Sequence, residues 1–178
     1  MVFKAQIMDE ASMGRSLKRI SHEILENNRG CERLCIVGIH SRGVPMAKRI
    51  AENIRQIEGV SVPCGTLNIA QYRDDKDELC DAVVTAETDI PFDIKGMDVV
   101  LVDDVIHTGR TVRAAMDALI ARGRPATVQL AAFVDRGHRE LPIKPNYVGK
   151  NVPTSRDEVV KVKFTETDGT DCVELYGK

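Results

Sequence analysis

Residues 99–111 read VVLVDDVIHTGRT, and this stretch decides the fold class of the chain. Four apolar residues in a row, between Asp98 and Asp103, predict a strand that is covered on both faces, as strands of parallel sheets are. The two acids then lie at the carboxyl end of the strand, where open α/β sheets bind ligands. A helix is predicted directly afterwards, from Thr111 to Arg122. The chain is therefore predicted to be an α/β protein with a mostly parallel central sheet flanked by helices.

The residues between this strand and helix predict an anion-binding loop. They are Thr108, Gly109, Arg110 and Thr111. Backbone N–H groups at a helix N-terminus attract phosphate, glycine permits close approach, and threonine hydroxyls add donors. Two acids would repel a bare phosphate, whereas carboxylates accept hydrogen bonds from vicinal sugar hydroxyls. We therefore predict a sugar phosphate ligand, with its ribose on Asp103 and Asp104 and its 5′-phosphate on the loop.

The whole run resembles the phosphoribosyl pyrophosphate (PRPP) signature of type I phosphoribosyltransferases. That signature consists of apolar residues, two acids, three variable positions and Thr-Gly-Lys/Arg-Thr. The phosphate motifs of Walker-type NTPases and Rossmann dehydrogenases are not found after any predicted strand. A solvated turn that caps the next helix would explain a lone Asp-Asp pair, but it does not explain the full run.

The composition of the 178-residue chain is that of one globular domain, with 43% hydrophobic residues, 29% charged residues and a net charge of −2. The near-neutral charge argues against unselective nucleic-acid binding. No apolar stretch approaches the roughly 20 residues that span a bilayer, and no signal peptide is recognised at the N-terminus. We expect a cytoplasmic protein that does not contact membranes. The five scattered cysteines favour reduced thiols over disulfides, and Cys31 and Cys35 lack the second pair of a zinc site.

Periodicity predicts the remaining elements. A helix with its cap at Asp9 is predicted to stop at residues 27–30, and another begins near Pro45. Strands are predicted over residues 34–39, 60–69 and 127–134, and alternation over residues 160–175 predicts a terminal β-hairpin. The charged residues 72–78 predict a mobile loop, which we extend to residues 72–85. One domain over residues 1–178 accommodates all of these elements.

A second loop follows the predicted strand 34–39. Its residues Ser41, Arg42 and Gly43 offer a hydroxyl, a cation and unhindered amides, which suit a pyrophosphate. By itself this loop is equally typical of a turn with a surface arginine. Because parallel strands place their carboxyl ends at one edge, we expect it beside the ribose site.

Three further stretches resemble the PyrR family, bacterial regulators of pyrimidine-operon attenuation that are also uracil phosphoribosyltransferases. They are residues 68–75 (NIAQYRDD), 134–142 (VDRGHRELP) and 147–155 (YVGKNVPTS). The similarity extends from about Ile7 to the terminal hairpin. It implies the type I phosphoribosyltransferase fold, with a hood (residues 135–155) above the base and the β-hairpin at the end.

The resemblance implies that uracil and PRPP give UMP and pyrophosphate. Mg²⁺ would be the cofactor, held by PRPP and water, and no side chain is assigned to it directly. Charge develops on the ribose and the leaving group, so the site needs electrostatic stabilisation more than a nucleophile. Catalysis would rest on Asp103, Asp104 and Arg73, with Arg42 and Arg73 on the pyrophosphate, and closure of loop 72–85 would exclude water. The uracil site would comprise Val134, Asp135, Arg136, His138 and Arg139.

Two positions depart from typical relatives, which carry tyrosine in place of His107 and aspartate in place of Asn68. An imidazole at residue 107 could face the base and transfer a proton. It could equally be a polar residue that fills the space of the tyrosine ring.

A basic stripe on the first helix is the candidate RNA-binding surface. Its residues Arg15, Lys18, Arg19 and His22 recur every three or four positions, opposite the core-facing side. Such a stripe is also typical of a solvated helix face. The resemblance implies that a homodimer or higher homo-oligomer uses it to bind an RNA hairpin of pyrimidine-gene leader mRNA, with UMP or UTP biasing affinity. Arg139, Lys144 and Lys150 could extend this surface.

Two other functions remain open at this point. One is a stand-alone phosphoribosyltransferase that salvages a base and has an inert basic helix. The other is a pure regulator with a degenerate transferase site, against which the intact Asp103, Asp104 and Arg73 argue.

Overall fold

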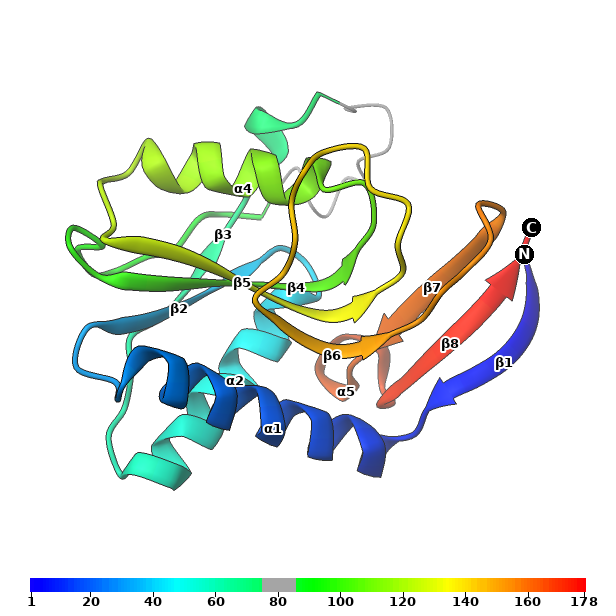
Figure 1. Ribbon diagram of the computed structural model, residues 1–178, viewed down its shortest axis with the longest axis horizontal. Coiled ribbons are helices and arrows are strands. Elements are labelled where there is room, and N and C mark those ends of the chain that lie inside the picture. The colour runs from blue at the N-terminus through cyan, green and yellow to red at the C-terminus, as the bar shows by residue number, and fades with distance from the viewer. Residues whose placement is uncertain (75–85) are drawn as a thin grey trace.

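Parallel strands form the centre of the computed structural model, which describes residues 1–74 and 86–178. They pair in the order β3-β2-β4-β5-β6 (Figure 1). Their bounds are Leu34–Ile39 for β2, Cys64–Leu67 for β3, Asp98–Ile106 for β4, Thr127–Asp135 for β5 and Tyr147–Asn151 for β6. Because β4 occupies the middle of the sheet, its apolar residues are buried on both faces.

Helices cover both faces of this sheet (Figure 1). Helices α1 (Glu10–Asn28) and α2 (Gly43–Glu58) pack on one face, and α4 (Arg110–Ile120) packs on the other with the short 3₁₀ helix η1 (Ala70–Tyr72). Helix α1 begins where Asp9 predicts, because its carboxylate accepts a hydrogen bond of 2.8 Å from the backbone nitrogen of Ser12. The order of layers is therefore helix, sheet, helix.

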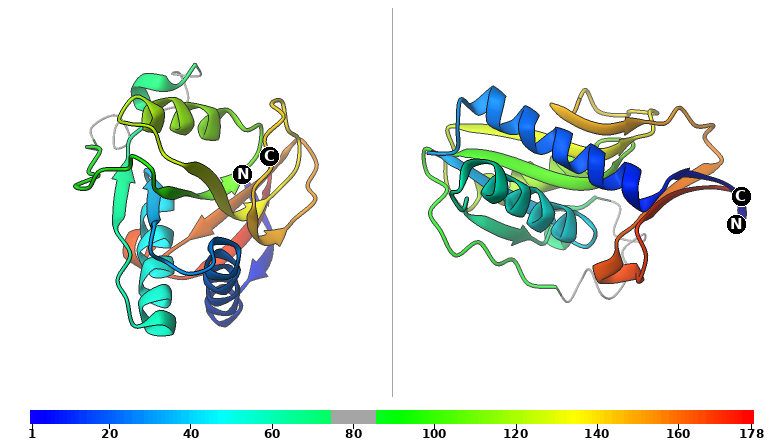
Figure 2. Two further views of the ribbon diagram at one scale, coloured as in Figure 1. Left: turned by 60° about the vertical axis from the view of Figure 1, so that its left-hand side comes forward. Right: turned by 90° about the horizontal axis from the view of Figure 1, so that it is seen from below.

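A second, antiparallel sheet lies beyond β6 and carries both chain termini (Figures 1 and 2). Its order is β1-β8-β7, with bounds Val2–Met8, Cys172–Gly177 and Glu158–Lys163. The short helix α5 (Thr165–Asp168) connects β7 to β8. Arg49 of α2 joins this sheet to the centre, because its guanidinium bonds to Glu166 and Asp171 and lies 5.1 Å from the ring centroid of Phe164.

Most predicted elements are confirmed, including the strand at residues 34–39, the helix that begins near Pro45 and the terminal hairpin. Three bounds were wrong. Strand β4 continues through both acids to Ile106, α4 spans residues 110–120, and β3 is confined to four residues after Pro63, whose nitrogen cannot donate to a neighbouring strand. Strands β1 and β6 were not predicted.

The predicted mobile loop falls largely outside the described residues, which include only its first residues 72–74. Among the described residues, Cys31, Cys35, Cys64 and Cys172 are free thiols, as expected. No helix within residues 1–74 and 86–178 has both the length and the apolar character that a bilayer span requires.

Candidate active site

The two acids of β4 lie side by side near the carboxyl end of that strand. Asp103 is 7% exposed and Asp104 is half-buried. Burial raises the pKa of both carboxyls, and the charge of Asp104 raises the pKa of Asp103 further. Two cations oppose this effect, because Arg73 faces Asp103 and Arg42 faces Asp104. The pair is thus held between two arginines as a concentrated set of hydrogen-bond acceptors.

A cavity of about 390 Å³ opens beside Asp103. Its lining includes Asp103, Arg73, His107 and all four residues 108–111 of the predicted anion loop. Gly109, the N-cap residue of α4, has a φ of 93°, which favours glycine, and it has no side chain that could cap the helix. The Thr108 hydroxyl accepts one hydrogen bond of 3.3 Å, from the backbone nitrogen of Arg110. The N–H groups that begin α4 therefore remain suited to an anion, as the sequence predicts.

The side chain of Arg110 does not point into this loop. It donates hydrogen bonds of 2.8 Å to Asp74 and of 2.8 Å to Glu140. The backbone nitrogens of Glu140 and Leu141 in turn donate to the carbonyl of Thr108, over 2.9 and 3.0 Å. Arg110 therefore contributes its backbone N–H to the anion loop, while its side chain connects the loop to its neighbours.

The second predicted loop leads from β2 into α2 and contains a cis peptide bond between His40 and Ser41. Gly43 is required by packing, since a Cβ there would overlap the carbonyl oxygen of Val102. Arg42 forms a two-pronged pair with Asp168, with nitrogen–oxygen distances of 2.7 and 3.2 Å. Burial would raise the pKa of Asp168, but hydrogen bonds from Arg42 and Thr167 lower it to about 2. No local pattern predicts this partner, which lies 126 residues away along the chain.

The hood approaches the anion loop from β5, and its backbone passes beside the N-terminal end of α4 (Figure 1). Arg136 is buried and donates to Thr154 and Ser155, and the Nε2 of His138 lies 2.6 Å from the carbonyl oxygen of Thr154. Thr154 was not among the predicted site residues, although it belongs to a quoted stretch. Thr154 thus joins the two ends of the hood by its bonds to Arg136 and His138.

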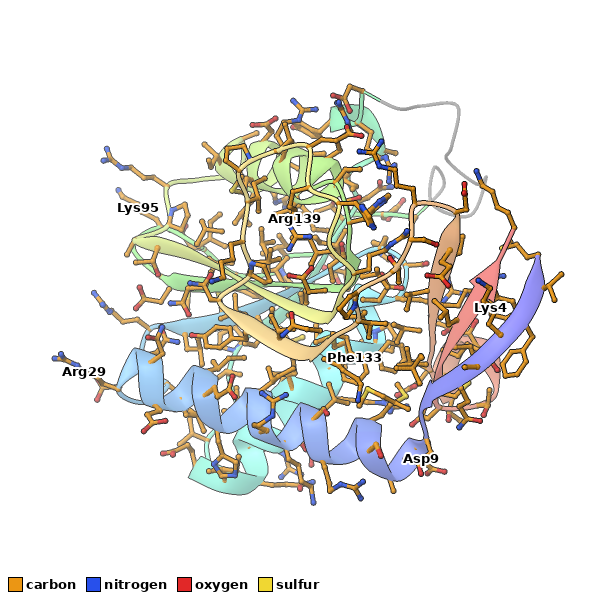
Figure 3. All side chains as sticks on the ribbon, turned by 45° about the vertical axis from the view of Figure 1, so that its right-hand side comes forward. Lys4, Asp9, Arg29, Lys95, Phe133 and Arg139 are labelled. Atoms are coloured by element: carbon orange, nitrogen blue, oxygen red, sulfur yellow. The ribbon has the colours of Figure 1, made fainter. Side chains whose placement is uncertain are left out.

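Two side chains that were predicted to bind the base make contacts within the protein instead. Val134 is fully buried in the core below the site, so that only its backbone can take part. The guanidinium of Arg139 bonds to Asp135 over 2.5 Å, to the carbonyl of His107 over 3.0 Å and to the carbonyl of Ile143 over 2.9 Å. Arg139 lies on the α4 side of the central sheet (Figure 3), so it does not extend the basic stripe of α1.

His107 lies half-buried between the anion loop and the hood, with its ring edge-on to His138 at a centroid distance of 6.1 Å. Burial lowers the pKa of His107, and the positive charges of Arg136, His138 and Arg139 lower it further against the opposing effect of Glu140. The structure therefore places a neutral imidazole in the cavity at neutral pH.

Asn68, the other unusual residue, acts on the backbone. Its side-chain nitrogen donates to the carbonyl of Ala86, its side-chain oxygen accepts from Ala70, and its backbone nitrogen donates to the hydroxyl of Thr88. A carboxylate could not make the first of these bonds. The residue thus fixes the end of β3 rather than lining the cavity of the acids.

The basic stripe forms on α1 as predicted. Arg15, Lys18, Arg19 and His22 are all exposed, as are Lys144 and Lys150 in the hood. Arg19 differs from the others, because its guanidinium bonds to the carbonyls of Val148 and Gly149.

Comparisons with known proteins agree on one family. A phosphoribosyl transferase domain model matches residues 5–166. Proteins named "Bifunctional protein PyrR" are 58% identical in Thermus aquaticus, over all of this chain and 98% of the relative, and 57% identical in Deinococcus radiodurans, over 97% and 94%. The solved hypoxanthine phosphoribosyltransferase of Trypanosoma cruzi superposes with a TM-score of 0.74 at 17% identity, over 99% of this chain and 98% of that one. This structural likeness confirms the type I phosphoribosyltransferase fold.

Proposed function

The chain belongs to the PyrR family of phosphoribosyltransferases, and on that premise we propose that it converts uracil and PRPP into UMP and pyrophosphate and binds leader RNA as an attenuation regulator of pyrimidine genes. The observation that carries the proposal is the identity of 54–58% to PyrR proteins over 94–100% of their length. The adjacent Asp103 and Asp104, near a helix N-terminus that begins at a glycine, support the transferase half independently.

Different residues of the site bind the ribose, the 5′-phosphate and the pyrophosphate of PRPP. Asp103 and Asp104 accept hydrogen bonds from the ribose hydroxyls, and the backbone N–H groups of residues 108–111 bind the 5′-phosphate. Arg42 and Arg73, which flank the acids, bind the pyrophosphate. As the bond at C1 breaks, positive charge develops on the ribose beside the carboxylates and negative charge on the leaving group beside the arginines.

The residues fit a Mg²⁺ ion that arrives with PRPP. Within residues 1–74 and 86–178, no group of three His, Cys, Asp or Glu side chains is placed to hold a metal by itself. Mg²⁺ keeps several waters and needs few protein ligands, so PRPP and water would hold it beside Asp103 and Asp104, with no side chain assigned to it directly. Bound there, the ion would supply charge neutralisation for the pyrophosphate, in addition to that from Arg42 and Arg73.

The base is bound under the hood, next to His107 and His138. Because the side chain of Val134 lies in the core, recognition of uracil rests on hood backbone groups with Asp135 and Arg136 behind them. The neutral imidazole of His107 can accept or donate one hydrogen bond to the base without adding charge.

The regulatory half uses the basic stripe of α1, with Lys144 and Lys150 as further contacts. Apart from Arg19, whose guanidinium is bonded to β6 and Glu23, these side chains suit RNA phosphates, and association into a homodimer would double the surface. UMP and UTP are the effectors that the transferase site would bind.

One experiment tests the transferase: PRPP and Mg²⁺ are incubated with uracil, hypoxanthine or guanine, and nucleotide and pyrophosphate are measured. Turnover with uracil alone is expected. Turnover with a purine would overturn the assignment, and binding of PRPP without turnover would indicate a regulator that has lost the chemistry.

A second experiment tests the regulator. Retention of a pyrimidine-leader RNA hairpin is measured with and without UMP at several salt concentrations. We expect tighter retention with UMP and a steep salt dependence. A protein that turns over uracil but does not retain the hairpin would be a stand-alone salvage enzyme.

A further inference from the structure

Arg19 stands apart from the other basic residues of α1 because it is bonded to another element. One guanidinium nitrogen donates to the carbonyl of Val148 over 3.0 Å and to that of Gly149 over 2.7 Å. The other terminal nitrogen pairs with Glu23 over 2.6 Å. Arg15, by contrast, bonds to Ser12 of its own helix. The charge of Arg19 is thus balanced and its donors face β6, which makes it a poor candidate for a simple phosphate contact.

Strand β6 is the edge of the central sheet and leads directly into the end of the hood. It pairs with β5 from Tyr147 to Asn151, and Val152 then donates to the carbonyl of Asp135 over 2.9 Å. The next residues hold the upper part of the hood, since Thr154 contacts both Arg136 and His138. Residues 148–154 therefore contact Arg19 at one end, through Val148 and Gly149, and the base-binding residues Arg136 and His138 at the other end, through Thr154.

This segment has little room to deform between those points. A Cβ on Gly149 would overlap the carbonyl oxygen of Phe133, so β6 already lies as close to β5 as the backbones allow. Interiors packed at this density shift between discrete arrangements more readily than they stretch. A displacement of His138 by a base would therefore move Thr154 and β6 together, and α1 would follow through Arg19.

We propose that Arg19 is a positioning residue that ties helix α1 to the hood through β6 and so couples occupation of the base site to the RNA-binding stripe. This inference rests on the proposed function and names the joint through which its two halves act on each other. By linkage, RNA on α1 must then change the affinity of the base site by the same factor as the nucleotide changes RNA affinity.

The test is Arg19→Lys, which keeps the charge. One ammonium nitrogen then replaces the two guanidinium nitrogens of which one bonds to β6 and the other to Glu23. Retention of the leader hairpin is measured with and without UMP, and KM is measured for uracil and for PRPP. We expect the ratio of the two hairpin affinities to fall at least threefold toward one, about the lower range of allosteric coupling. We expect the KM for uracil to rise about threefold and the KM for PRPP to change less, because the residues assigned to the ribose and the 5′-phosphate lie on β4 and at the start of α4.

Two matched variants define the controls. Arg55→Lys makes the same change at an exposed position of α2. Arg55 pairs with Glu52 of its own helix and, among the described residues, its side chain bonds to no other element. Glu23→Gln removes the carboxylate partner of Arg19 but leaves its bonds to Val148 and Gly149 possible. Both should keep the wild-type coupling ratio and uracil KM.

Equal loss of hairpin affinity with and without UMP in Arg19→Lys would overturn the proposal and make Arg19 an ordinary RNA contact. An unchanged uracil KM or an unchanged coupling ratio would overturn it as well. Failure of the proposed function is distinguishable, because the wild-type protein would then lack uracil turnover or hairpin retention before any variant is compared.

Discussion

At the residue scale, the site is built around a pair of carboxylates whose placement favours function over stability. Asp103 and Asp104 are neighbours in the central strand, and burial raises the pKa of each. An acid whose folded pKa is raised holds protons that the unfolded chain has already released. Its contribution to stability is therefore lost as the pH rises above the ordinary range of aspartate.

Asp103→Asn should reveal this cost. We expect the variant to lose about 100-fold in kcat/KM, because a donor now faces the ribose, and to gain about 1 kcal/mol in free energy of unfolding at pH 7. The gain should shrink at pH 4, where the wild-type acids hold their protons. Urea denaturation at both pH values and uracil turnover measure these effects. Asp98→Asn, at the opposite end of β4, is the control that keeps turnover. A variant less stable at pH 7 than the wild type would contradict the argument.

His107 gives the opposite pH dependence. Its folded pKa is lowered by burial and by neighbouring cations, so below about pH 6.5 the unfolded chain binds more protons and the folded protein loses stability. We expect His107→Gln to lose less stability than the wild type between pH 7 and pH 5.5. Thermal melts between pH 7 and pH 5.5 measure the change of stability with pH. An identical change for His107→Gln and the wild type would refute the expectation.

At the element scale, two glycines show how differently a helix and an edge strand depend on backbone space. Gly14 lies in the interior of α1. Apart from its chain neighbours and the backbone of its own helix, no atom of the described residues lies within 4 Å of where a Cβ would be. Gly149 lies in β6, where a Cβ would overlap the carbonyl oxygen of Phe133 and press on its ring. The first glycine is dispensable, whereas the second is required by the contact between β5 and β6.

Alanine at these two positions should therefore shift stability in opposite directions. Gly14→Ala should raise the free energy of unfolding by about 0.5–1 kcal/mol through the helix preference of alanine. Gly149→Ala should lower it by about 1–3 kcal/mol through overpacking. Urea denaturation of the two variants in parallel measures both changes, and equal shifts would refute the assignment of close packing to β6.

The elements predicted from sequence are those whose signals are local. Continuous apolar runs predict β2 and β4, and the Asp9 cap predicts the start of α1. Strand β6 contains a glycine and two exposed polar residues, and β1 pairs with β8 at the other end of the chain, so neither has a local signal. The anion loop and the acids were predicted for the same local reason, whereas Asp168 and Glu140 enter the site only through tertiary contacts.

At the scale of the whole molecule, two sheets share one core. Arg49 of α2 bonds to Glu166 and Asp171 and stacks on Phe164, whose ring lies edge-on to Phe133 of β5 at a centroid distance of 6.1 Å. The antiparallel sheet is thereby joined to the central sheet, and we expect both to unfold in one transition.

Arg49→Lys should lower the free energy of unfolding by about 1–2 kcal/mol, because lysine cannot bond to two carboxylates as a fork. The transition should remain single, with circular dichroism and tyrosine fluorescence coincident during urea denaturation. Arg55→Lys is the matched control on the same helix and should change little. Separate transitions in the wild-type protein would show that the two sheets are independent.

The antiparallel pairing of β1 with β8 brings Val2 opposite Gly177, and the two chain ends meet at one corner of the molecule (Figure 1). Neighbouring strands lie only about 5 Å apart, so a few glycines and serines would join them. The backbone could then be reopened at the exposed residues 59–61. These residues follow the C-terminal end of α2, whereas Arg42 precedes its N-terminal end. Such a circular permutant would keep the same cavity, but its new chain ends would lie beside β3, at the edge of the central sheet opposite β6. A reporter domain could be attached there without obstructing the ligand.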